Sequence, residues 1–561
     1  MTEATVVLRD SVRPSDHQPR LPRERLLVEE APDEEAVPMD VIFVGGGPAG
    51  LAGAIELARL AKQDAGAGGE AASLEIGVLD KAGQLGEHSL SGAVVNPSAF
   101  HELFPDLSPD DFPFRRPVTK EAVYFLTESR AVRMPTPPTM RNHGNHVASI
   151  CEIVRWLGEK AEELGVNVFP GFPVDSLLVD GGRVIGVRTT PAGLGRDGAP
   201  SGTDAMPAMD LTGRVTVLAE GTRGALSQAW LEWQGVTSDN PPIFALGVKE
   251  LWQVKRPLDR VVHTMGWPLP SDVFGGSFMY PMADDLVALG LVAGMDYADA
   301  RFDVHHALQR MKLHPLFRPY LEDGEMVEWG AKTIPEGGYY SVPKRRHGDG
   351  LLIVGDAAGY VEVSSLKGIH YAMHSGIMAA RQIFAALKAD DTSEAGLAGY
   401  TEAVDASLVM RDLKRRRNMR LAFKDGLAVG SVKAGAMTLT GGAFPGGRIA
   451  VEEDAARAKT LEPEAHGPAP DGKLTFSKVD AVYRSGNQTR DDIPSHLVVG
   501  EDVSAEAAEL YVHMCPAGVY ERDGEELVVN APNCIDCKAT DVLGPRWTPR
   551  EGGSGPAYRL M

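Results

Sequence analysis

Short apolar runs followed by helical periodicities recur along the chain, and this alternation predicts an α/β protein. Residues 40–44 (DVIFV) and 351–354 (LLIV) are continuous apolar runs rich in branched side chains, as buried parallel strands are. Residues 51–61 follow the first run with apolar side chains at helical spacing. Residues 74–79 predict a second strand that leads into Asp80. The pattern therefore indicates a parallel sheet covered by helices.

Polar, Gly-rich or Pro-rich stretches interrupt this pattern and predict loops. Residues 64–73 (DAGAGGEAAS) predict a surface loop, and residues 191–207 predict a long hairpin excursion between two apolar runs. Residues 452–472 are charged and Pro-rich, which suggests a boundary before a C-terminal unit. Residues 1–38 predict a polar N-terminal tail, and they contain no apolar run typical of a signal peptide.

One segment suggests contact with a membrane surface. No run of about 18 apolar residues predicts a spanning helix. Residues 426–444 are moderately apolar and follow four basic residues, 414–417, a combination that can seat a protein on a lipid surface. A loop and short helix packed on the body of the protein explain the same residues equally well.

Composition excludes some classes of function. The chain has 561 residues, enough for about three or four domains, and 43% of them are hydrophobic, as in a globular protein. The formal net charge of −21 argues against nucleic-acid binding, which needs clustered Lys and Arg. Only four cysteines are present, too few for a disulfide scaffold, and three of them lie close to the C-terminus.

The segment 45–50 (GGGPAG) matches the dinucleotide-binding pattern G-x-G-x-x-G between a strand and a helix. We expect Gly45 to allow the tight turn, Gly47 to let the backbone approach a pyrophosphate, and Gly50 to let the helix pack close to the strand. Pro48 and Ala49 would begin the helix, whose free N–H groups would face the phosphates. A chance glycine turn before an ordinary helix is the alternative.

Two carboxylates extend this site. Asp80 ends the second strand and can accept hydrogen bonds from ribose hydroxyls; the insertion at 64–73 accounts for a spacing longer than the usual ~20 residues. Residues 351–354 lead into 355–359 (GDAAG), which resembles the second FAD fingerprint of the glutathione-reductase-like flavoproteins. In that fingerprint the Asp, here Asp356, holds a ribityl hydroxyl. The ligand indicated is FAD.

The C-terminal cysteines suggest metal binding. Cys534 and Cys537 form a C-x-x-C pair, and Cys515 is followed by a proline, as cluster cysteines of ferredoxins often are. Such a pair also suits zinc or a redox dithiol, and His513 would allow a Cys₃His zinc site. An iron–sulfur cluster is the more coherent companion of FAD. Cys151 stands in an apolar context and is expected in the core.

From about residue 40 to residue 561 the chain resembles the electron transfer flavoprotein–ubiquinone oxidoreductase family. The matching segments occur in one order along the chain: 86–94 (GEHSLSGAV), 142–145 (NHGN), 154–157 (VRWL), 263–269 (HTMGWPL), 275–278 (GGSF), 355–359 (GDAAG), 367–368 (KG), 515–521 (CPAGVYE), 533–534 (NC) and 555–558 (GPAY).

The resemblance implies a glutathione-reductase-like FAD fold with two dinucleotide motifs, an inserted β-sheet quinone domain and a small ferredoxin-like iron–sulfur domain. After the N-terminal tail, the expected parts are an FAD domain (39–110, 141–235 and 341–400), a quinone domain (111–140 and 236–340), a helical, membrane-surface segment with a linker (401–470) and an iron–sulfur domain (471–561).

The family relationship also implies an activity: electrons from reduced electron transfer flavoprotein pass through a 4Fe–4S cluster and FAD to ubiquinone or another membrane quinone. The implied location is peripheral, on the cytoplasmic face of an inner membrane. No catalytic nucleophile is expected. The residues expected at FAD are Gly45, Gly47, Pro48, Ala49, Gly50, Asp80, Lys81, Gly86, Ser91, Gly92, Gly355, Asp356, Gly359 and Gly368. Gly275 and Gly276 are expected at the quinone, or alternatively in a bulge or turn of a strand.

One ligand position departs from the family. The family motif is N-C-x-x-C-x-x-C-D, and this chain has Thr540 in place of the last cysteine, followed by Asp541. Three outcomes are open: Asp541 ligates the fourth iron, three thiolates hold a 3Fe–4S cluster, or the cluster is lost. Two other functions also stay open, an FAD-dependent hydroxylase or polyprenyl reductase and a partner-binding protein with a zinc module.

Overall fold

The computed structural model describes residues 12–67, 74–92, 94–202, 205–456 and 467–561. Its largest sheet has nine strands. Parallel pairing joins β9 (Asn167–Pro170), β3 (Ile76–Asp80), β2 (Val37–Val44), β12 (Asp210–Leu218) and β19 (Leu351–Ile353) in that order. Both predicted dinucleotide strands, 40–44 and 351–354, thus lie in the parallel part of one sheet, as the apolar runs predicted, while β10 (Val174–Asp180) and β11 (Arg183–Thr189) add antiparallel pairs to it.

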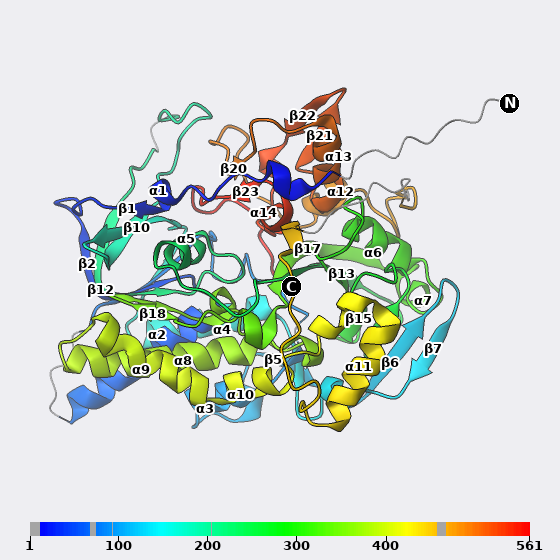
Figure 1. Cartoon of the computed structure of the whole chain (residues 1–561), viewed down its shortest axis with the longest axis horizontal. Coiled ribbons are helices and arrows are strands. Elements are labelled where there is room, and N and C mark those ends of the chain that lie inside the picture. Colours follow the sequence, from blue (N-terminus) through cyan, green and yellow to red (C-terminus); the bar gives the residue numbers. More distant parts are fainter. Residues whose placement is uncertain (1–11, 68–73, 93, 203–204, 457–466) are drawn as a thin grey trace.

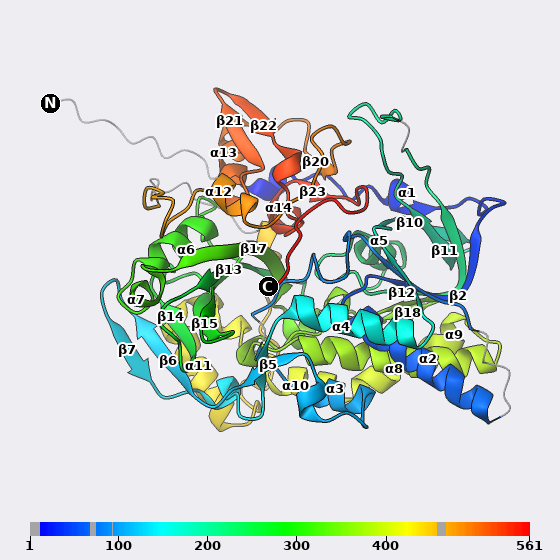
Figure 2. The same cartoon turned by 180° about the vertical axis from the view of Figure 1, so that it is seen from behind.

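Helices α2 (Pro48–Gly66) and α8 (Ile369–Lys388) pack side by side on one face of this sheet, with α4 (Ile150–Glu163) beside them (Figure 2). Their close approach depends on glycine. A Cβ built on Gly376 of α8 would lie 2.1 Å from the Ala49 carbonyl oxygen of α2. Each of the two helices follows one of the two predicted FAD fingerprints, so both helix N-termini reach the same edge of the sheet.

A second sheet, of seven strands, stands beside the first (Figure 1). Its order is β17 (Glu325–Pro335), β13 (Phe244–Gln253), β16 (Leu286–Gly294), β15 (Gly275–Pro281), β14 (Val261–Gly266), β6 (Glu121–Leu126) and β7 (Ala131–Met134). Strands β6 and β7 precede α4 in the chain, so the segment that forms this sheet is discontinuous.

The C-terminal unit covers both sheets at their junction. It contains α12 (Lys478–Tyr483), α13 (Ala505–Met514), the hairpin β21 (Tyr520–Asp523) and β22 (Glu526–Val529), α14 (Ala539–Leu543), and the pair β20 (Leu497–Val498) and β23 (Arg546–Trp547). The last residue returns to the first unit, where the Ile150 N–H donates to the Met561 carbonyl at 3.0 Å. The chain end is therefore part of the packed structure.

Helices α9 (Glu394–Ala406), α10 (Leu408–Arg415) and α11 (Leu427–Leu439) connect α8 to the C-terminal unit. Met437 of α11 is 1% exposed and packs with Met419 and Ala422, which fixes this helix to the body of the protein. None of the helices in the described residues is both long and apolar enough to cross a membrane.

Three loop and tail predictions have different outcomes. The predicted excursion between β11 (Arg183–Thr189) and β12 is confirmed, and an antiparallel bridge joins Ala192 to Met206 at its base. The predicted loop 64–73 begins too early, because α2 continues to Gly66 and Asp64 pairs with Lys388 of α8 at 2.5 Å. Residues 68–73 lie outside the described part.

The predicted polar tail is also partly wrong. Within residues 1–38, α1 (Arg23–Leu26) places Leu26 in the core with no exposed surface, and β1 (Leu27–Val28) pairs with β10 (Val174–Asp180). Three consecutive apolar residues, 26–28, are enough to add a strand to the edge of the sheet. Residues 1–11 are outside the described part.

Candidate cofactor sites

A cavity of about 390 Å³ lies between the two sheets and the C-terminal unit. The β2–α2 turn, the end of β3, residues 86–92, the start of α8, strands β13, β15 and β17, and Trp547 all contribute to its lining. Of the predicted FAD residues, all except Gly50 and Gly359 line it: Gly45, Gly47, Pro48, Ala49, Asp80, Lys81, Gly86, Ser91, Gly92, Gly355, Asp356 and Gly368.

The three motif glycines differ in what a side chain would meet. Gly45 has φ +114°, and a Cβ there would lie 2.4 Å from the Ala219 carbonyl oxygen, so the tight turn requires glycine. A Cβ on Gly50 would lie 2.1 Å from the Gly45 carbonyl oxygen, because helix and strand pack closely. A Cβ on Gly47 would meet no protein atom within 4 Å. Gly47 thus leaves space for a ligand, as a pyrophosphate at this helix N-terminus requires.

Asp80 is held in place by the backbone around it. Its carboxylate accepts hydrogen bonds from the Gly46 N–H at 2.7 Å and the Ala82 N–H at 2.9 Å. Burial nevertheless raises the pKa of this carboxyl above its ordinary value. The side chain is therefore fixed at the end of β3, where a ribose hydroxyl can reach it.

The second predicted fingerprint forms the opposite part of the cavity. The Gly355 N–H donates to the Ser375 hydroxyl of α8 at 2.9 Å, and Gly359 takes a left-handed conformation (φ +81°) that ends the turn. Gly368 precedes α8, and a Cβ there would lie 3.9 Å from Asp356 Oδ1. Burial raises the pKa of Asp356 to about 6. This carboxyl faces the cavity as the ribityl partner would.

Three lysines line the wall nearest the C-terminal unit: Lys81, Lys332 and Lys538. Burial lowers the pKa of Lys332 to about 8 and that of Lys538 to about 7, and the charge of Lys81 adds to both shifts. The ammonium groups of Lys81 and Lys538 each lie 4.5 Å from the ring centre of Trp547. Clustered, poorly solvated cations fit a pyrophosphate or an anionic thiolate cluster.

The three predicted cluster cysteines lie in the C-terminal unit next to this wall, and all are buried. Burial raises the pKa of each thiol, to about 12 for Cys534, and the neighbouring thiols raise the pKa values of Cys534 and Cys537 further. A redox dithiol needs a lowered pKa and exposure, so this pair does not fit that alternative.

A backbone N–H group faces each of these sulfurs. Ala517 donates to Cys515 Sγ at 3.4 Å, and the N–H groups of Asp536 and Ala539 lower the thiol pKa values of Cys534 and Cys537. Such donors stabilise thiolates that bind a cluster.

The spacing of the sulfurs does not suit one zinc ion. In the part of the chain that the structure describes, only His496, Cys534 and Asp536 bring three possible ligand atoms within 4.8 Å of one another. Three thiolates on one zinc would stand about 3.8 Å apart, given Zn–S bonds of about 2.3 Å. Cysteines that bind different irons of one cluster stand farther apart, so the three thiols fit a cluster better.

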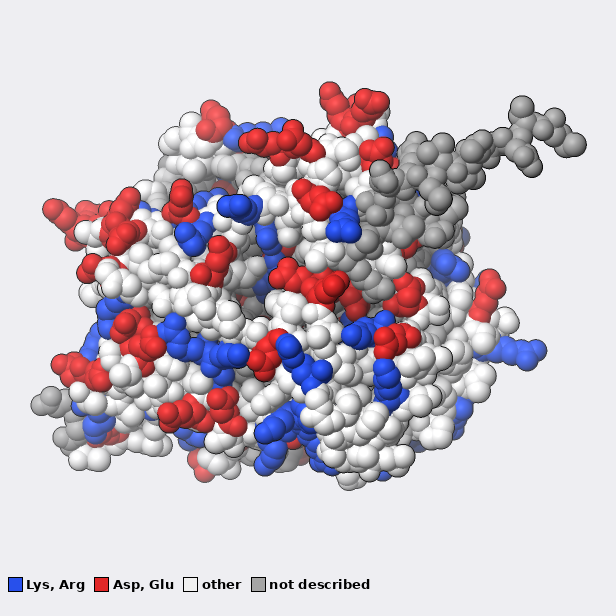
Figure 3. Space-filling model, in the orientation of Figure 1, with Lys and Arg blue, Asp and Glu red and all other residues white. Residues whose placement is uncertain are grey.

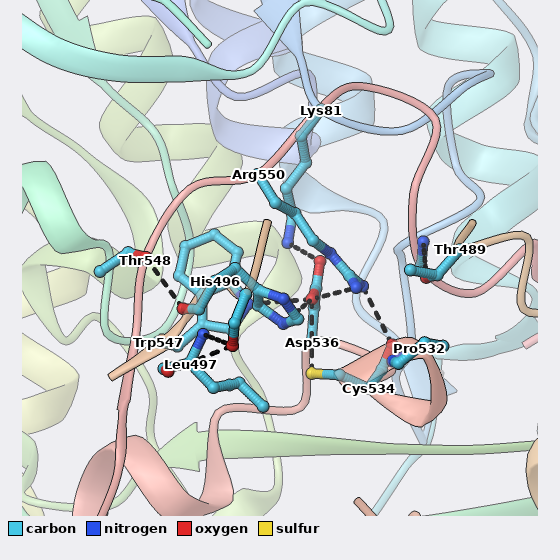
Figure 4. Close-up of polar contacts among 12 residues, drawn as sticks. Lys81, Thr489, His496, Leu497, Pro532, Cys534, Asp536, Trp547, Thr548 and Arg550 are labelled. Carbon is cyan, nitrogen blue, oxygen red and sulfur yellow. Dashed lines mark hydrogen bonds and ion pairs between the residues drawn. The ribbon is translucent and has the colours of Figure 1, made fainter. Parts of the chain in front are cut away.

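The His496–Cys534–Asp536 group is an unsuitable cation site. Asp536 Oδ1 accepts from Arg550 Nη2 and Trp547 Nε1, both at 2.9 Å, and Lys81 lies at the other oxygen (Figure 4). Burial alone would raise the pKa of Asp536, but Arg550 and Lys81 hold it well below its ordinary value. A metal ion here would face two cationic side chains. We therefore interpret Asp536 as a residue that links the cysteine loop to Lys81 at the wall of the cavity.

Asp541, the other possible ligand, is occupied elsewhere. Its Oδ2 pairs with Arg223 Nε at 2.5 Å, and its Oδ1 accepts from the Trp547 N–H at 3.0 Å. Burial opposes the negative charge, but the Arg223 and Arg546 guanidiniums hold the pKa of Asp541 below its ordinary value. Both oxygens thus have partners.

Gly275 and Gly276 begin β15 and do not line the cavity, whereas Phe278 and Tyr280 of the same strand do. A Cβ on Gly275 would lie 2.1 Å from the Val292 carbonyl oxygen, and one on Gly276 would lie 2.2 Å from that of Thr264. The close approach of the neighbouring strands is therefore enough to explain why both positions are glycine. Their contact with a quinone stays a prediction.

Several residues of these sites were missed from the sequence. Asp536 lies inside the C-x-x-C motif and could have been suspected as a charge beside the cluster. Lys538 directly follows the same motif and could have been suspected as well. Lys332 and Arg223 have no local signal, because tertiary packing alone brings them to the site.

Comparisons with known proteins agree with this arrangement. A family model described as "ETF-QO, ubiquinone-binding" matches residues 244–334. A second, described as "Electron transfer flavoprotein-ubiquinone oxidoreductase, 4Fe-4S", matches residues 472–559. The first match covers most of the seven-stranded sheet, and the second covers all three cluster cysteines.

Full-length relatives carry the same description. The mitochondrial electron transfer flavoprotein-ubiquinone oxidoreductase of Dictyostelium discoideum is 36% identical, over 95% of this chain and 92% of its own length. The corresponding human protein is 37% identical, over 93% of this chain and 89% of its own length. A geranylgeranyl bacteriochlorophyll reductase-like protein from Thermoplasma acidophilum shares the fold, with a TM-score of 0.57 and 17% identity, over 73% of this chain and 96% of its own.

Proposed function

The chain belongs to the electron transfer flavoprotein–ubiquinone oxidoreductase family, and we propose that it accepts electrons from reduced electron transfer flavoprotein and delivers them to ubiquinone or another membrane quinone. FAD and an iron–sulfur cluster supply the redox chemistry, and a flavin suits this task because it can hold one or two electrons. The chain itself supplies binding, orientation and a charged environment.

The observation that carries this proposal is the shared wall of the two cofactor sites. Lys81 lines the cavity directly after Asp80, and its ammonium pairs with Asp536 of the C-x-x-C loop at 2.5 Å. Trp547 lines the same cavity and donates to Asp536. A flavin in the cavity and a cluster on the three cysteines would therefore be separated by only a few side chains.

The quinone side of the proposal rests on the seven-stranded sheet. Phe278 and Tyr280 of β15 stack with ring centres 4.7 Å apart and line the cavity, and the Tyr280 hydroxyl lies 2.7 Å from His263 Nε2. This aromatic wall suits a planar, apolar ring on the side of the cavity that faces the seven-stranded sheet. Gly275 and Gly276, at the start of the same strand, lie outside the cavity lining and are the proposed contact of the quinone head group.

The proposed membrane-facing surface is α11. Val429, Val432, Leu439 and, just after the helix, Phe444 are 48%, 76%, 91% and 46% exposed. Figure 3 shows a largely uncharged area over α11, with basic side chains beside it. The Leu427 N–H donates to the Ser271 carbonyl, and the Phe274 and Phe423 rings lie 4.9 Å apart, so α11 adjoins the start of β15. A lipid-soluble quinone would enter there.

The function is tested with the FAD- and cluster-loaded protein, reduced electron transfer flavoprotein and a short-chain ubiquinone. We expect quinone reduction that requires the donor flavoprotein and is lost in a variant without FAD. Flavin reduction by NADPH without any response to the donor flavoprotein would overturn the proposal in favour of a hydroxylase or polyprenyl reductase. The placement on the cytoplasmic face of an inner membrane stays a prediction.

A further inference from the structure

The fourth corner of the cluster site differs in chemistry from the other three. Cys534, Cys537 and Thr540 are spaced by three residues each, and Thr540 lies in the first turn of α14, 8% exposed. Tyr520 packs in one buried cluster with Cys515, Cys534, Cys537 and Ala539, and the Thr540 hydroxyl is next to the Tyr520 oxygen. Thr540 therefore faces the cluster site from the position of the expected fourth ligand.

Thr540 is a poor substitute for a cysteine. Iron–sulfur clusters are held by thiolates, which are soft, anionic donors, whereas a threonine hydroxyl is hard and neutral. Its side chain is also shorter, since a C–O bond replaces a C–S bond. The adjacent Tyr520 hydroxyl is another neutral oxygen.

Asp541 cannot take over without breaking two contacts. Turning its carboxylate toward the cluster would remove the 2.5 Å pair with Arg223 and the 3.0 Å hydrogen bond from the Trp547 N–H. The Arg223 side chain is only 11% exposed and would lose its carboxylate partner in a buried site. Removing one partner of a buried ion pair is strongly unfavourable.

The other possible ligands near the cysteines lie among cationic side chains. His496 is within 4.8 Å of Cys534 and Asp536, and Asp536 in turn contacts Lys81 and Arg550. His496 therefore lies among the side chains around Asp536, beside Arg550 and Trp547 (Figure 4). Among the described residues, the one group of three His, Cys, Asp or Glu ligand atoms within 4.8 Å of one another includes neither Asp541 nor His513.

We propose that this chain holds its cluster by Cys515, Cys534 and Cys537 alone, and that the resting enzyme carries a three-iron cluster whose open corner faces Thr540. The proposal rests on the proposed function, since it describes the cofactor through which electrons from the donor flavoprotein would pass. It departs from the four-iron cluster that the matched family model describes. This departure follows from Thr540 in place of the expected cysteine and from the pair with Arg223, which keeps Asp541 from serving as the fourth ligand.

The test measures iron, acid-labile sulfide and FAD in the protein purified with and without air, together with EPR spectra of oxidised and reduced samples. We expect about three irons per FAD and the EPR signal of an oxidised three-iron cluster, because three thiolates bind three irons. Thr540→Cys should raise the ratio to about four and replace that signal by the spectrum of a reduced four-iron cluster.

Two further variants separate the possible fourth ligands. Thr540→Val keeps the shape and removes the hydroxyl, and Asp541→Asn keeps an oxygen for the Trp547 N–H; we expect neither to change iron content or spectrum. Four irons in the wild-type protein would overturn the proposal, and loss of one iron in Thr540→Val or in Asp541→Asn would then identify the ligand.

The same measurements distinguish failure of this proposal from failure of the proposed function. Four irons with intact transfer of electrons to quinone would refute the three-iron cluster and leave the function standing. Zinc, or no metal at all in the anaerobically purified protein, would refute the three-iron cluster, and the assay with reduced electron transfer flavoprotein would still decide the function. Three irons without transfer of electrons to quinone would refute the function and leave the three-iron cluster standing.

Discussion

The Asp536 carboxylate lies 2.5 Å from the Lys81 ammonium, and this contact ties the loop that carries two cluster cysteines to the end of the strand that carries Asp80. Asp536 is 1% exposed and has a left-handed backbone conformation, with φ +54°. The loop therefore adopts a strained conformation in which its carboxylate meets Lys81, Arg550 and Trp547.

Asp536→Asn should disturb electron transfer more than folding of the rest of the chain. Removing a buried negative charge leaves Lys81 and Arg550 without their counter-charge, so we expect the midpoint potentials of the cluster and FAD to rise. Quinone reduction should fall roughly 10- to 100-fold, as for other residues that support metal ligands. Potentiometric titration followed by EPR and flavin absorbance measures the shift.

Asp523→Asn is the matched control, because Asp523 is an exposed acid of the neighbouring β21–β22 hairpin. It should leave both potentials unchanged. Equal effects of the two substitutions would show that Asp536 acts only through the net charge of the protein.

Gly47→Ala and Gly45→Ala should fail for different reasons. The Gly47 methyl would point into the cavity, so this variant should fold with a free energy of unfolding within about 0.5 kcal/mol of the wild-type apoprotein yet bind FAD poorly. The Gly45 methyl would clash with the Ala219 carbonyl, and this variant should be unstable with or without FAD. Chemical denaturation and FAD retention after gel filtration measure both; normal FAD retention in Gly47→Ala would contradict the assigned pyrophosphate position.

Asp356 should make the stability of the apoprotein depend on pH. Because burial raises its pKa from 3.8 to about 6, the folded apoprotein binds this proton more tightly than the unfolded chain does. The stabilisation is complete below about pH 4 and is lost as the pH rises through about 6.

Asp356→Asn removes this titration. Above about pH 7 the variant apoprotein should be more stable than wild type by at most about 3 kcal/mol, reduced where water in the cavity screens the charge. The advantage should vanish below about pH 4. Chemical denaturation of both apoproteins across this pH range measures the difference in their free energies of unfolding. A difference that does not change with pH would contradict the raised pKa of Asp356. FAD binding should be weaker in the variant at every pH.

The α11 surface predicts a specific loss of membrane binding. Replacing Val432 and Leu439 by Glu removes two exposed apolar side chains, so binding to anionic vesicles should fall at least about tenfold. Activity with a short-chain quinone in solution should be unchanged. Tyr483→Glu, on α12 of the C-terminal unit and 82% exposed, is the control and should bind vesicles as wild type does. Unaltered vesicle binding of the α11 variant would place the membrane contact elsewhere.

Local chemistry explains what the sequence could predict. The motif glycines, Asp80 and Asp356 each follow an apolar strand, so the pattern alone indicated their places, and the cavity brings them together. Arg223 and Lys332 were not predictable, because they approach Asp541 and Asp536 only through the packing of distant elements.

For the same reason the sequence left open whether Asp541 is a cluster ligand, a role that its pair with Arg223 opposes. In the N-terminal segment, by contrast, local structure was missed from the sequence. Its many charges concealed Leu26 and the short strand that follows, since a single buried turn is a weak signal in a polar stretch.

The central claim is that electrons move from a reduced donor flavoprotein through this chain to a quinone. It is tested most directly by mixing the fully loaded protein anaerobically with reduced electron transfer flavoprotein and following the absorbance of its FAD and the EPR signal of its cluster in samples frozen at successive times. The account predicts that the donor is oxidised while both the cluster and the FAD of this chain gain electrons, and that adding a quinone then reoxidises them. A donor that stays reduced, or an FAD that is never reduced in its presence, would contradict the account.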